Sequence, residues 1–243
     1  MQQRPAHSLP GNSTKATKGD RFGLVAVSML GLVLFFLVLL VLPQAGLLFR
    51  FYSTPSTSME PNYHIGGYTL INRASYGFSS KSFDWFSLPI AGRWPDLAPQ
   101  RGDVIVFKQP KDGRTDFVKR VIGIGGDKVQ MIKDEIWLNG ELVQRNAEGT
   151  FEFKDASNKT LAAPVYRETL PGGVSFAHVE LEGAGAVLAN TEIFEVPARQ
   201  LFVLGDNRDN STDSRVPPTL NGIGFVPVEF VVGRVIATFG GTP

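Results

Sequence analysis

The sequence predicts a mainly β domain preceded by one transmembrane helix. Its 243 residues include 26 glycines, 16 prolines and 18 phenylalanines, a composition that favours a turn-rich β fold over a helical bundle. Short apolar runs of strand length, separated by turn signals, recur from Tyr68 to the C-terminus. One much longer apolar run, Phe22–Leu42, carries no charge and has the length of a membrane-spanning helix.

The composition also excludes several classes of site. The formal net charge of +1 gives no basic surplus, so we expect no nucleic-acid partner. Because the chain has no cysteine, it has no disulfide, no thiolate metal site and no cysteine nucleophile. Three histidines supply few metal ligands and few general bases. We therefore expect neither a metal nor a cofactor.

The N-terminal part reads as a tail followed by a membrane anchor. Residues 1–21 are polar and lack hydrophobic periodicity, as in a disordered tail. The alternative for Phe22–Leu42 is a cleaved secretory signal, whose apolar region is typically only about 7–15 residues and ends in a small-x-small cleavage site. Here the run is longer and is followed by Pro43-Gln44-Ala45, so the sequence favours a retained span over 22–42.

The distribution of basic residues around this run predicts its orientation. Four basic residues precede the span, and the next one after it is Arg50; the four are Arg4, Lys15, Lys18 and Arg21. The positive-inside rule then puts the N-terminus in the cytoplasm. We expect a single-pass protein of the inner (plasma) membrane, with residues 43–243 as a periplasmic or extracytoplasmic domain.

The segment Pro55–Pro61 places two serines, Ser56 and Ser58, between two prolines. Prolines fix φ and disfavour helix in the preceding residue, so this segment is expected to be stiff and extended. Ser/Thr/Pro clusters are also ordinary linker composition, and these residues alone do not exclude a linker. A rigidly held serine beside a membrane is nevertheless a candidate nucleophile.

The rest of the chain is read as strands and turns. An inserted β subdomain over about 140–200 contains no recognisable chemistry. The aromatic-rich segment 76–95 either dips into the membrane interface or packs over the edge of the core. The glycine-rich segment Gly123–Lys128 is predicted to be a turn, and Asn139-Gly140 a hairpin turn. Strands are expected at Tyr68–Asn72, Val104–Phe107, Asp116–Ile122, Ile136–Leu138, Glu141–Val143, Leu201–Leu204 and Phe230–Thr238.

A serine nucleophile needs a base, and the histidines are poorly placed to supply one. His7 precedes the predicted span, His64 lies in an irregular stretch, and His178 lies in the inserted region. Lys119 is the alternative, because a fully buried lysine can lose about 3–5 pKa units and so hold a neutral amine near pH 7. Spare hydroxyls at Ser56 and Ser211 could orient that amine and stabilise an oxyanion.

Four segments, in order after the apolar run, resemble the conserved boxes of bacterial type I signal peptidases. They read PSTSMEP, RGDVIVFKQP, DFVKRVIGIGGDKV and GDNRDNSTDSR. The resemblance implies a signal-peptidase-like β catalytic domain that acts as a serine endopeptidase on exported preproteins. The partners it implies are signal peptides, the lipid bilayer and the secretion machinery.

By the same resemblance, Ser58 is the nucleophile and Lys119 the general base of a Ser-Lys dyad. Ser56 would share the oxyanion hole with the Ser58 N–H, and Ser211 would hold the Lys119 amine. The supporting scaffold would consist of an Asp213–Arg215 ion pair and of Asp206, Asn207, Arg208 and Asp209. The substrate would lie extended as an added strand, with its small side chains against Thr54, Pro55, Met59 and Val118.

The chain departs from the family pattern at three places that spare the proposed catalytic residues. These are Asn62 after Pro61, Gly125 before GDK, and an insertion at Val216–Gly222. One rival reading keeps the dyad but gives it a dedicated substrate, as in pilin or conjugation-type maturation. Another is a non-catalytic, membrane-tethered β module in which Ser58 is linker and Lys119 is a solvated charge.

Overall fold

The computed structural model divides into two compact units, Met1–Gly46 and Leu47–Pro243. In the first unit a helix runs over 27–37. Among the residues described, no helix combines the length and apolarity needed to cross a membrane. The predicted tail and both ends of the predicted span, 22–26 and 38–42, lie outside the described residues. The structure describes residues 27–37, 46–84, 86–154, 159–181 and 188–242.

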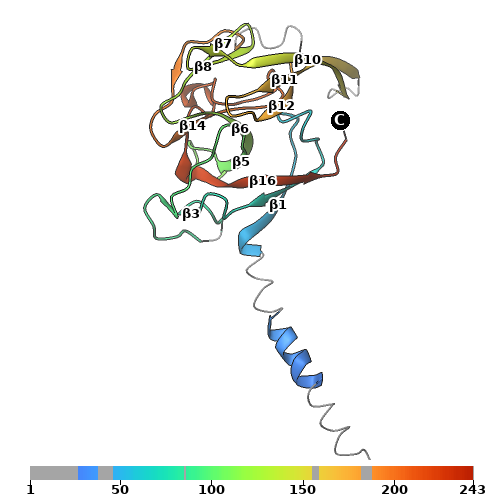
Figure 1. Cartoon of the computed structure of the whole chain (residues 1–243), viewed down its shortest axis with the longest axis vertical. Helices are drawn as coiled ribbons and strands as arrows, with labels where there is room; N and C mark the ends of the chain where they lie inside the picture. The colour runs from blue at the N-terminus through green and yellow to red at the C-terminus, as the bar shows by residue number, and fades with distance from the viewer. Residues whose placement is uncertain (1–26, 38–45, 85, 155–158, 182–187, 243) are drawn as a thin grey trace, which may run out of the picture. The chain divides into compact units, whose positions relative to one another are not determined.

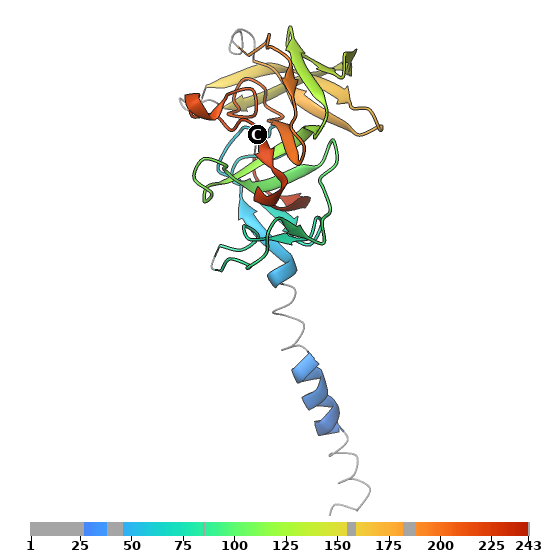
Figure 2. The ribbon, with the colours of Figure 1, turned by 90° about the vertical axis from the view of Figure 1, so that its left-hand side faces the viewer.

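The second unit is built mainly from antiparallel strands, which confirms the mainly β class predicted for this part of the chain (Figures 1 and 2). Its largest sheet has seven strands in its described part. In spatial order these are β1 (Phe49–Ser53), β2 (Tyr68–Asn72), β16 (Val231–Phe239), β5 (Val104–Lys108), β6 (Asp116–Ile124), β14 (Gln200–Leu204) and β15 (Val226–Pro227).

Three smaller sheets complete the described part of this unit. The three-stranded sheet contains β10 (Gln144–Lys154), β11 (Thr160–Thr169) and β12 (Ser175–Val179). The four-stranded sheet runs in the order β13 (Phe194–Glu195), β7 (Lys128–Ile132), β8 (Glu135–Leu138) and β9 (Glu141–Leu142). The pair β3 (Phe78–Ser79) and β4 (Arg93–Trp94) and the short 3-10 helices η1 (Pro218–Leu220) and η2 (Val228–Phe230) are the remaining elements.

The predicted strands agree with the observed ones to within a few residues. The predicted hairpin forms between β8 and β9, where Asn139 and Gly140 take φ values of 56° and 85° as a tight hairpin turn requires. The glycine-rich segment becomes a turn later than predicted, because Gly123 and Ile124 still belong to β6. The predicted last strand begins one residue later than expected, since Phe230 ends η2.

The aromatic segment 76–95 divides between core and surface. Tyr76 is buried, and its hydroxyl donates a 2.7 Å hydrogen bond to Asp103. The Phe83 ring stacks on that of Phe86, whereas Trp94 is 75% exposed. The inner part of this segment therefore packs on the sheet, and its outer part meets solvent.

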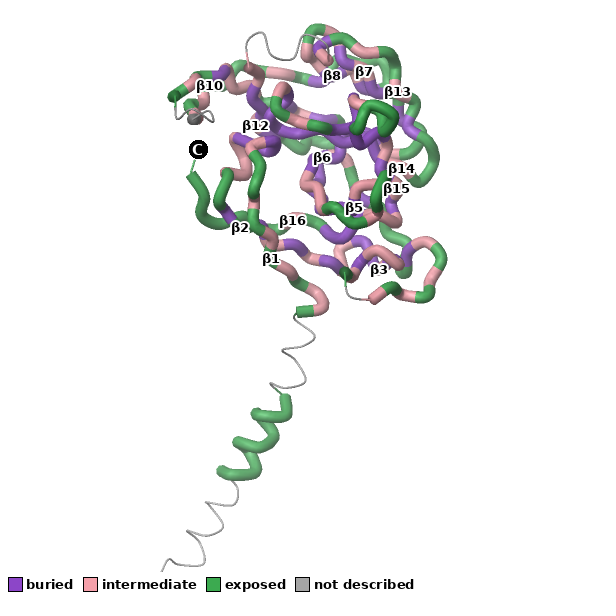
Figure 3. The backbone as a smooth tube through the Cα atoms, turned by 180° about the vertical axis from the view of Figure 1, so that it is seen from behind, coloured by how far each residue is buried: buried purple, intermediate pink, exposed green. Residues whose placement is uncertain are grey.

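Strand β6 lies between β5 and β14 in the large sheet, and its residues 119–123 are buried (Figure 3). Its successive side chains point to opposite faces, because Val121 joins one hydrophobic cluster and Ile122 another. Lys119 pairs with Ile105 of β5 in the ladder and is likewise buried. Lys119 therefore lies in the buried part of the strand.

Candidate active site

The sheet brings Ser58 and Lys119 together across 61 residues of sequence. Ser58 follows β1 and Lys119 lies in β6, and the Lys119 Nζ donates a 2.6 Å hydrogen bond to the Ser58 Oγ. Lys119 is 2% exposed and Ser58 is 8% exposed. In this arrangement, shielded from water, a neutral amine can take the proton of the hydroxyl.

Burial changes the acidity of the Lys119 ammonium. Desolvation lowers its pKa from the ordinary value of 10.5 to about 8, and Arg215 adds to this effect. The carboxylates of Asp213 and Asp206 act in the opposite direction. At pH 7 about a tenth of the side chain is therefore neutral amine, far more than in a lysine with the ordinary pKa.

The two groups expected to form an oxyanion hole are bonded to each other: the Ser58 backbone N–H donates a 3.2 Å hydrogen bond to the Ser56 Oγ. The Ser58 carbonyl accepts a 3.1 Å hydrogen bond from the Asn207 N–H. This second bond holds the segment Pro55–Pro61 against the loop that follows β14.

Ser211 lines a cavity that Ser58 and Lys119 also line, but no hydrogen bond joins the Ser211 hydroxyl to the Lys119 amine. Its Oγ is buried and has no hydrogen-bond partner among the described residues. The loop passes very close here: a Cβ built on Gly205 would stand less than 3.0 Å from both the Ser211 side chain and the Ser58 carbonyl oxygen. Only glycine leaves room for the two segments to approach in this way.

The ion pair Asp213–Arg215 forms inside the loop at 2.9 Å, with both side chains fully buried. Burial alone raises the pKa of Asp213, but the Arg215 guanidinium outweighs it and holds that pKa below its usual value. The Asp213 carboxylate also accepts the Gly205 N–H at 3.2 Å. A negative charge is thereby fixed next to Lys119.

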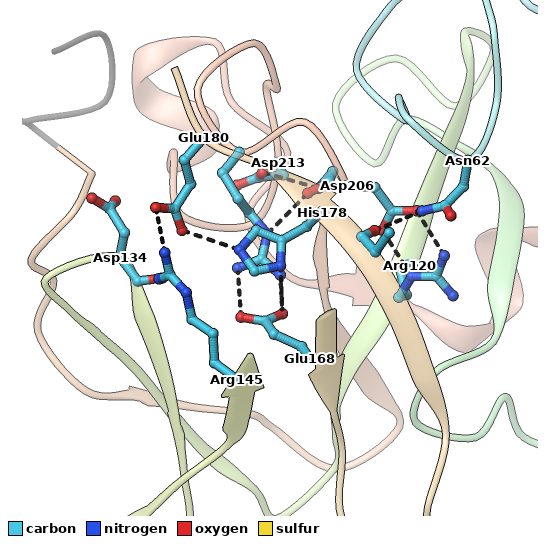
Figure 4. A network of polar contacts seen from close by, with 12 residues as sticks. Asn62, Arg120, Asp134, Arg145, Glu168, His178, Glu180, Asp206 and Asp213 are labelled. Atoms are coloured by element: carbon cyan, nitrogen blue, oxygen red, sulfur yellow. Dashed lines mark hydrogen bonds and ion pairs between the residues drawn. The ribbon is translucent and has the colours of Figure 1, made fainter. Parts of the chain in front are cut away.

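A second buried pair, Arg120–Asp206, sits at the start of the loop (Figure 4). Asn62 donates hydrogen bonds of 2.7 Å to the Asp206 carboxylate and to the Ala177 carbonyl. The departure from the family pattern at Asn62 is thus part of the scaffold, because its amide joins the nucleophile segment to both the loop and β12.

A cavity of about 590 Å³ runs along this site. All four residues predicted as substrate walls line it, namely Thr54, Pro55, Met59 and Val118. The sequence prediction missed Tyr52 and Asp116, which line it too. Period-2 alternation carries the signal for both, because each precedes a predicted wall residue by two positions in an extended segment.

Comparisons with known proteins show the family of this chain. The family model "Signal peptidase, peptidase S26" matches residues 27–239. A Signal peptidase I of Rickettsia typhi is 34% identical over 206 residues, which cover 82% of this chain and 75% of that protein. A Signal peptidase I of Rickettsia prowazekii is 33% identical over 230 residues, covering 92% and 80%.

A crystal structure of a signal peptidase I from Enterococcus faecalis V583 is 31% identical and covers 57% of this chain and 97% of its own, with a TM-score of 0.31. The sequence matches carry the assignment, since they extend over most of both chains. The chain belongs to the bacterial type I signal peptidases of the peptidase S26 family, and it is a serine endopeptidase.

Proposed function

We propose that this protein is a membrane-bound endopeptidase that removes N-terminal signal peptides from exported preproteins with a Ser58–Lys119 dyad. The observation that carries the proposal is the 2.6 Å hydrogen bond between the two side chains, combined with the 2% exposure of Lys119. The curated relatives bear the name Signal peptidase I. The test is processing of a purified preprotein by the wild type and by dyad variants, argued in the Discussion.

In the proposed reaction the neutral Lys119 amine takes the Ser58 proton as Oγ attacks the scissile carbonyl. The Ser58 N–H and the Ser56 hydroxyl donate to the oxyanion of the tetrahedral intermediate. The Lys119 ammonium, steadied by Asp213, then protonates the leaving amine. In the second half, Lys119 deprotonates a water that hydrolyses the acyl-enzyme and frees Ser58.

Replacing the two supporting serines is expected to give different losses. Ser56→Ala removes one oxyanion donor and should lower kcat by about 10²–10³-fold with little change in KM. Ser211→Ala should lower kcat roughly tenfold, because in the proposal the Ser211 hydroxyl only orients the Lys119 amine. This hydroxyl has no hydrogen-bond partner among the described residues, so it is available for that role. Steady-state kinetics on one preprotein measures both.

Ser87→Ala is the matched control, because this exposed serine does not line the cavity and lies outside the proposed machinery. It is expected to retain wild-type kinetics. Wild-type kcat in the Ser56→Ala variant would remove Ser56 from the oxyanion hole.

We propose that the signal peptide binds as an extended strand between the Ser58 segment and β6. The cavity runs between these segments, and added strands gain affinity from main-chain hydrogen bonds and specificity from alternate side chains. Small side chains at the first and third positions before the cut would rest on the walls formed by Thr54, Pro55, Met59 and Val118.

Enlarging one wall should therefore discriminate against the natural small side chains. Val118→Phe is expected to lower kcat/KM by about 10- to 200-fold on a preprotein with alanine at both positions. Replacing those alanines by glycine should recover part of the loss, because it returns the space that the phenyl ring takes. An equal loss on both substrates would mean that Val118 does not line the subsites.

We also propose that the chain is anchored by Phe22–Leu42, with its N-terminus in the cytoplasm and its catalytic domain on the outer face, where the secretion machinery delivers preproteins. Apart from the basic residues before this run, support comes from exposed apolar side chains on β1, β2 and β16, because contiguous patches of this kind mark interaction surfaces. They are Phe49, Phe51, Tyr68, Ile236 and Phe239. Recovery of the full chain in the soluble fraction after a carbonate wash of the membranes would refute anchoring.

A further inference from the structure

A buried charged cluster lies directly behind the loop 205–215, on the three-stranded sheet (Figure 4). Arg208 of the loop donates hydrogen bonds to the carboxylate of Glu168 in β11. The His178 Nδ1 of β12 lies 3.6 Å from the same carboxylate. Glu168, His178 and Arg208 are each at most 1% exposed. None of these contacts touches the dyad itself.

Of the two ring nitrogens, Nδ1 has no hydrogen-bond partner among the described residues, and Nε2 has one. The His178 Nε2 lies 3.1 Å from the Glu180 carboxylate, which forms a 2.7 Å ion pair with Arg145. Burial first, and Arg208 next, lower the pKa of His178 to about 3. The ring is therefore neutral at physiological pH, and we assign its proton to Nε2, where it is donated to Glu180.

Hydrogen bonds connect Arg208 to the residues around Lys119. The Arg208 carbonyl accepts a hydrogen bond from Arg215, the partner of Asp213. The Arg208 N–H donates to the Val179 carbonyl at 3.0 Å, and the Val179 N–H donates to the Asp206 carbonyl at 2.9 Å. Movement of Arg208 would thus move the carboxylate that faces Lys119.

Stability alone is a weak reason for such a cluster. Fully buried ion pairs lose so much hydration that apolar side chains of equal volume often stabilise a fold as well or better. In the same sheet, β10 and β11 carry an exposed pair, Glu148–Arg167, which shows that an ion pair on this sheet does not require burial. Unlike an exposed pair, the buried cluster holds Arg208 in a fixed position.

We propose that Glu168 and His178 are positioning residues of the protease, which hold the loop 205–215 so that Ser211 and Asp213 remain beside Lys119. The three-stranded sheet then has a role in catalysis although none of its residues reaches the dyad. This inference rests on the proposed dyad.

The test compares Glu168→Gln with Glu148→Gln, an equal change at the exposed pair, by kcat, KM and the pH profile on one preprotein, corrected for the folded fraction. Glu168→Gln should lower kcat about tenfold or more while KM stays within about twofold, because the substrate walls are untouched. The carboxylates of Asp213 and Asp206 raise the pKa of Lys119 and Arg215 lowers it. Displacing Asp213 should therefore lower the pKa of Lys119 and shift the acidic side of the pH–activity profile to lower pH.

Glu148→Gln is expected to match the wild type in all three. If Glu168→Gln does not fold, His178→Gln, which keeps the Arg208–Glu168 pair, should show a smaller kcat loss, about threefold, with the same direction of pH shift. Wild-type kcat and an unshifted pH–activity profile in the folded variant overturn the inference. Lys119→Ala in parallel separates the two hypotheses: if it remains active, the dyad fails; if it is inactive while Glu168→Gln is normal, only the positioning role fails.

Discussion

Replacing Lys119 with alanine is expected to lower kcat for preprotein processing by about 10⁴-fold or more, the loss that removal of a catalytic base or nucleophile typically produces. The reason is that Ser58 has no other base within hydrogen-bond reach among the described side chains; its Oγ is bonded to the Lys119 Nζ. Ser58→Ala should lose as much, and the double variant no more, because the two residues act as one unit. Quantitative gel analysis of precursor and mature product measures these losses.

The matched control is Lys128→Ala, a change of the same kind at an exposed lysine whose side chain forms a surface ion pair with Glu195. It should process preprotein at the wild-type rate, because surface pairs contribute little. Circular dichroism of the dyad variants should show the wild-type β fold. Processing that survives in a folded Lys119→Ala variant would leave the dyad without support, and the non-catalytic reading of Ser58 as linker would regain its place.

The second large effect is a steep dependence of activity on pH. The active form of Lys119 is the neutral amine, and burial lowers the pKa of this side chain to about 8. Below that value the neutral fraction, and with it kcat/KM, should fall about tenfold for each pH unit, and above it the profile should level off. At pH 6 the enzyme is thus expected to retain roughly one hundredth of its plateau activity.

Asp213→Asn should displace this limb in a known direction. The Asp213 carboxylate raises the pKa of Lys119, so its removal lowers that pKa and moves the limb to lower pH. A limb near the ordinary lysine value of about 10.4 in the wild type would instead indicate a solvated amine. The measurement is kcat/KM across the pH range, with protein stability followed at each pH.

The sequence was sufficient for features that depend on local pattern. A continuous apolar run predicted β5, alternation predicted β6, and Asn139-Gly140 predicted the β8–β9 turn, because strand and turn preferences act over a few residues. The burial of Lys119 could not be read this way. It depends on β6 lying between β5 and β14, which is a property of the whole sheet.

Long-range partners account for most of what the sequence did not reveal. Glu168 and His178 looked featureless in the inserted region. Arg208, the partner of Glu168, is 40 residues away and meets it only in the folded chain. Similarly, Asn62 stood as a departure from the family pattern until its contact with Asp206 gave it a partner. Residue types at such positions carry information only once the register of the strands is known.

The central claim is that one buried lysine amine titrates near pH 8 beside the serine hydroxyl. Its most direct measurement is an NMR titration of protein with isotope-labelled lysine side chains, in which the Lys119 resonance is identified by its absence from Lys119→Met. We expect this resonance to titrate near pH 8, about two units or more below the ordinary lysine value of about 10.4. A Lys119 resonance that titrates near that ordinary value would contradict the account.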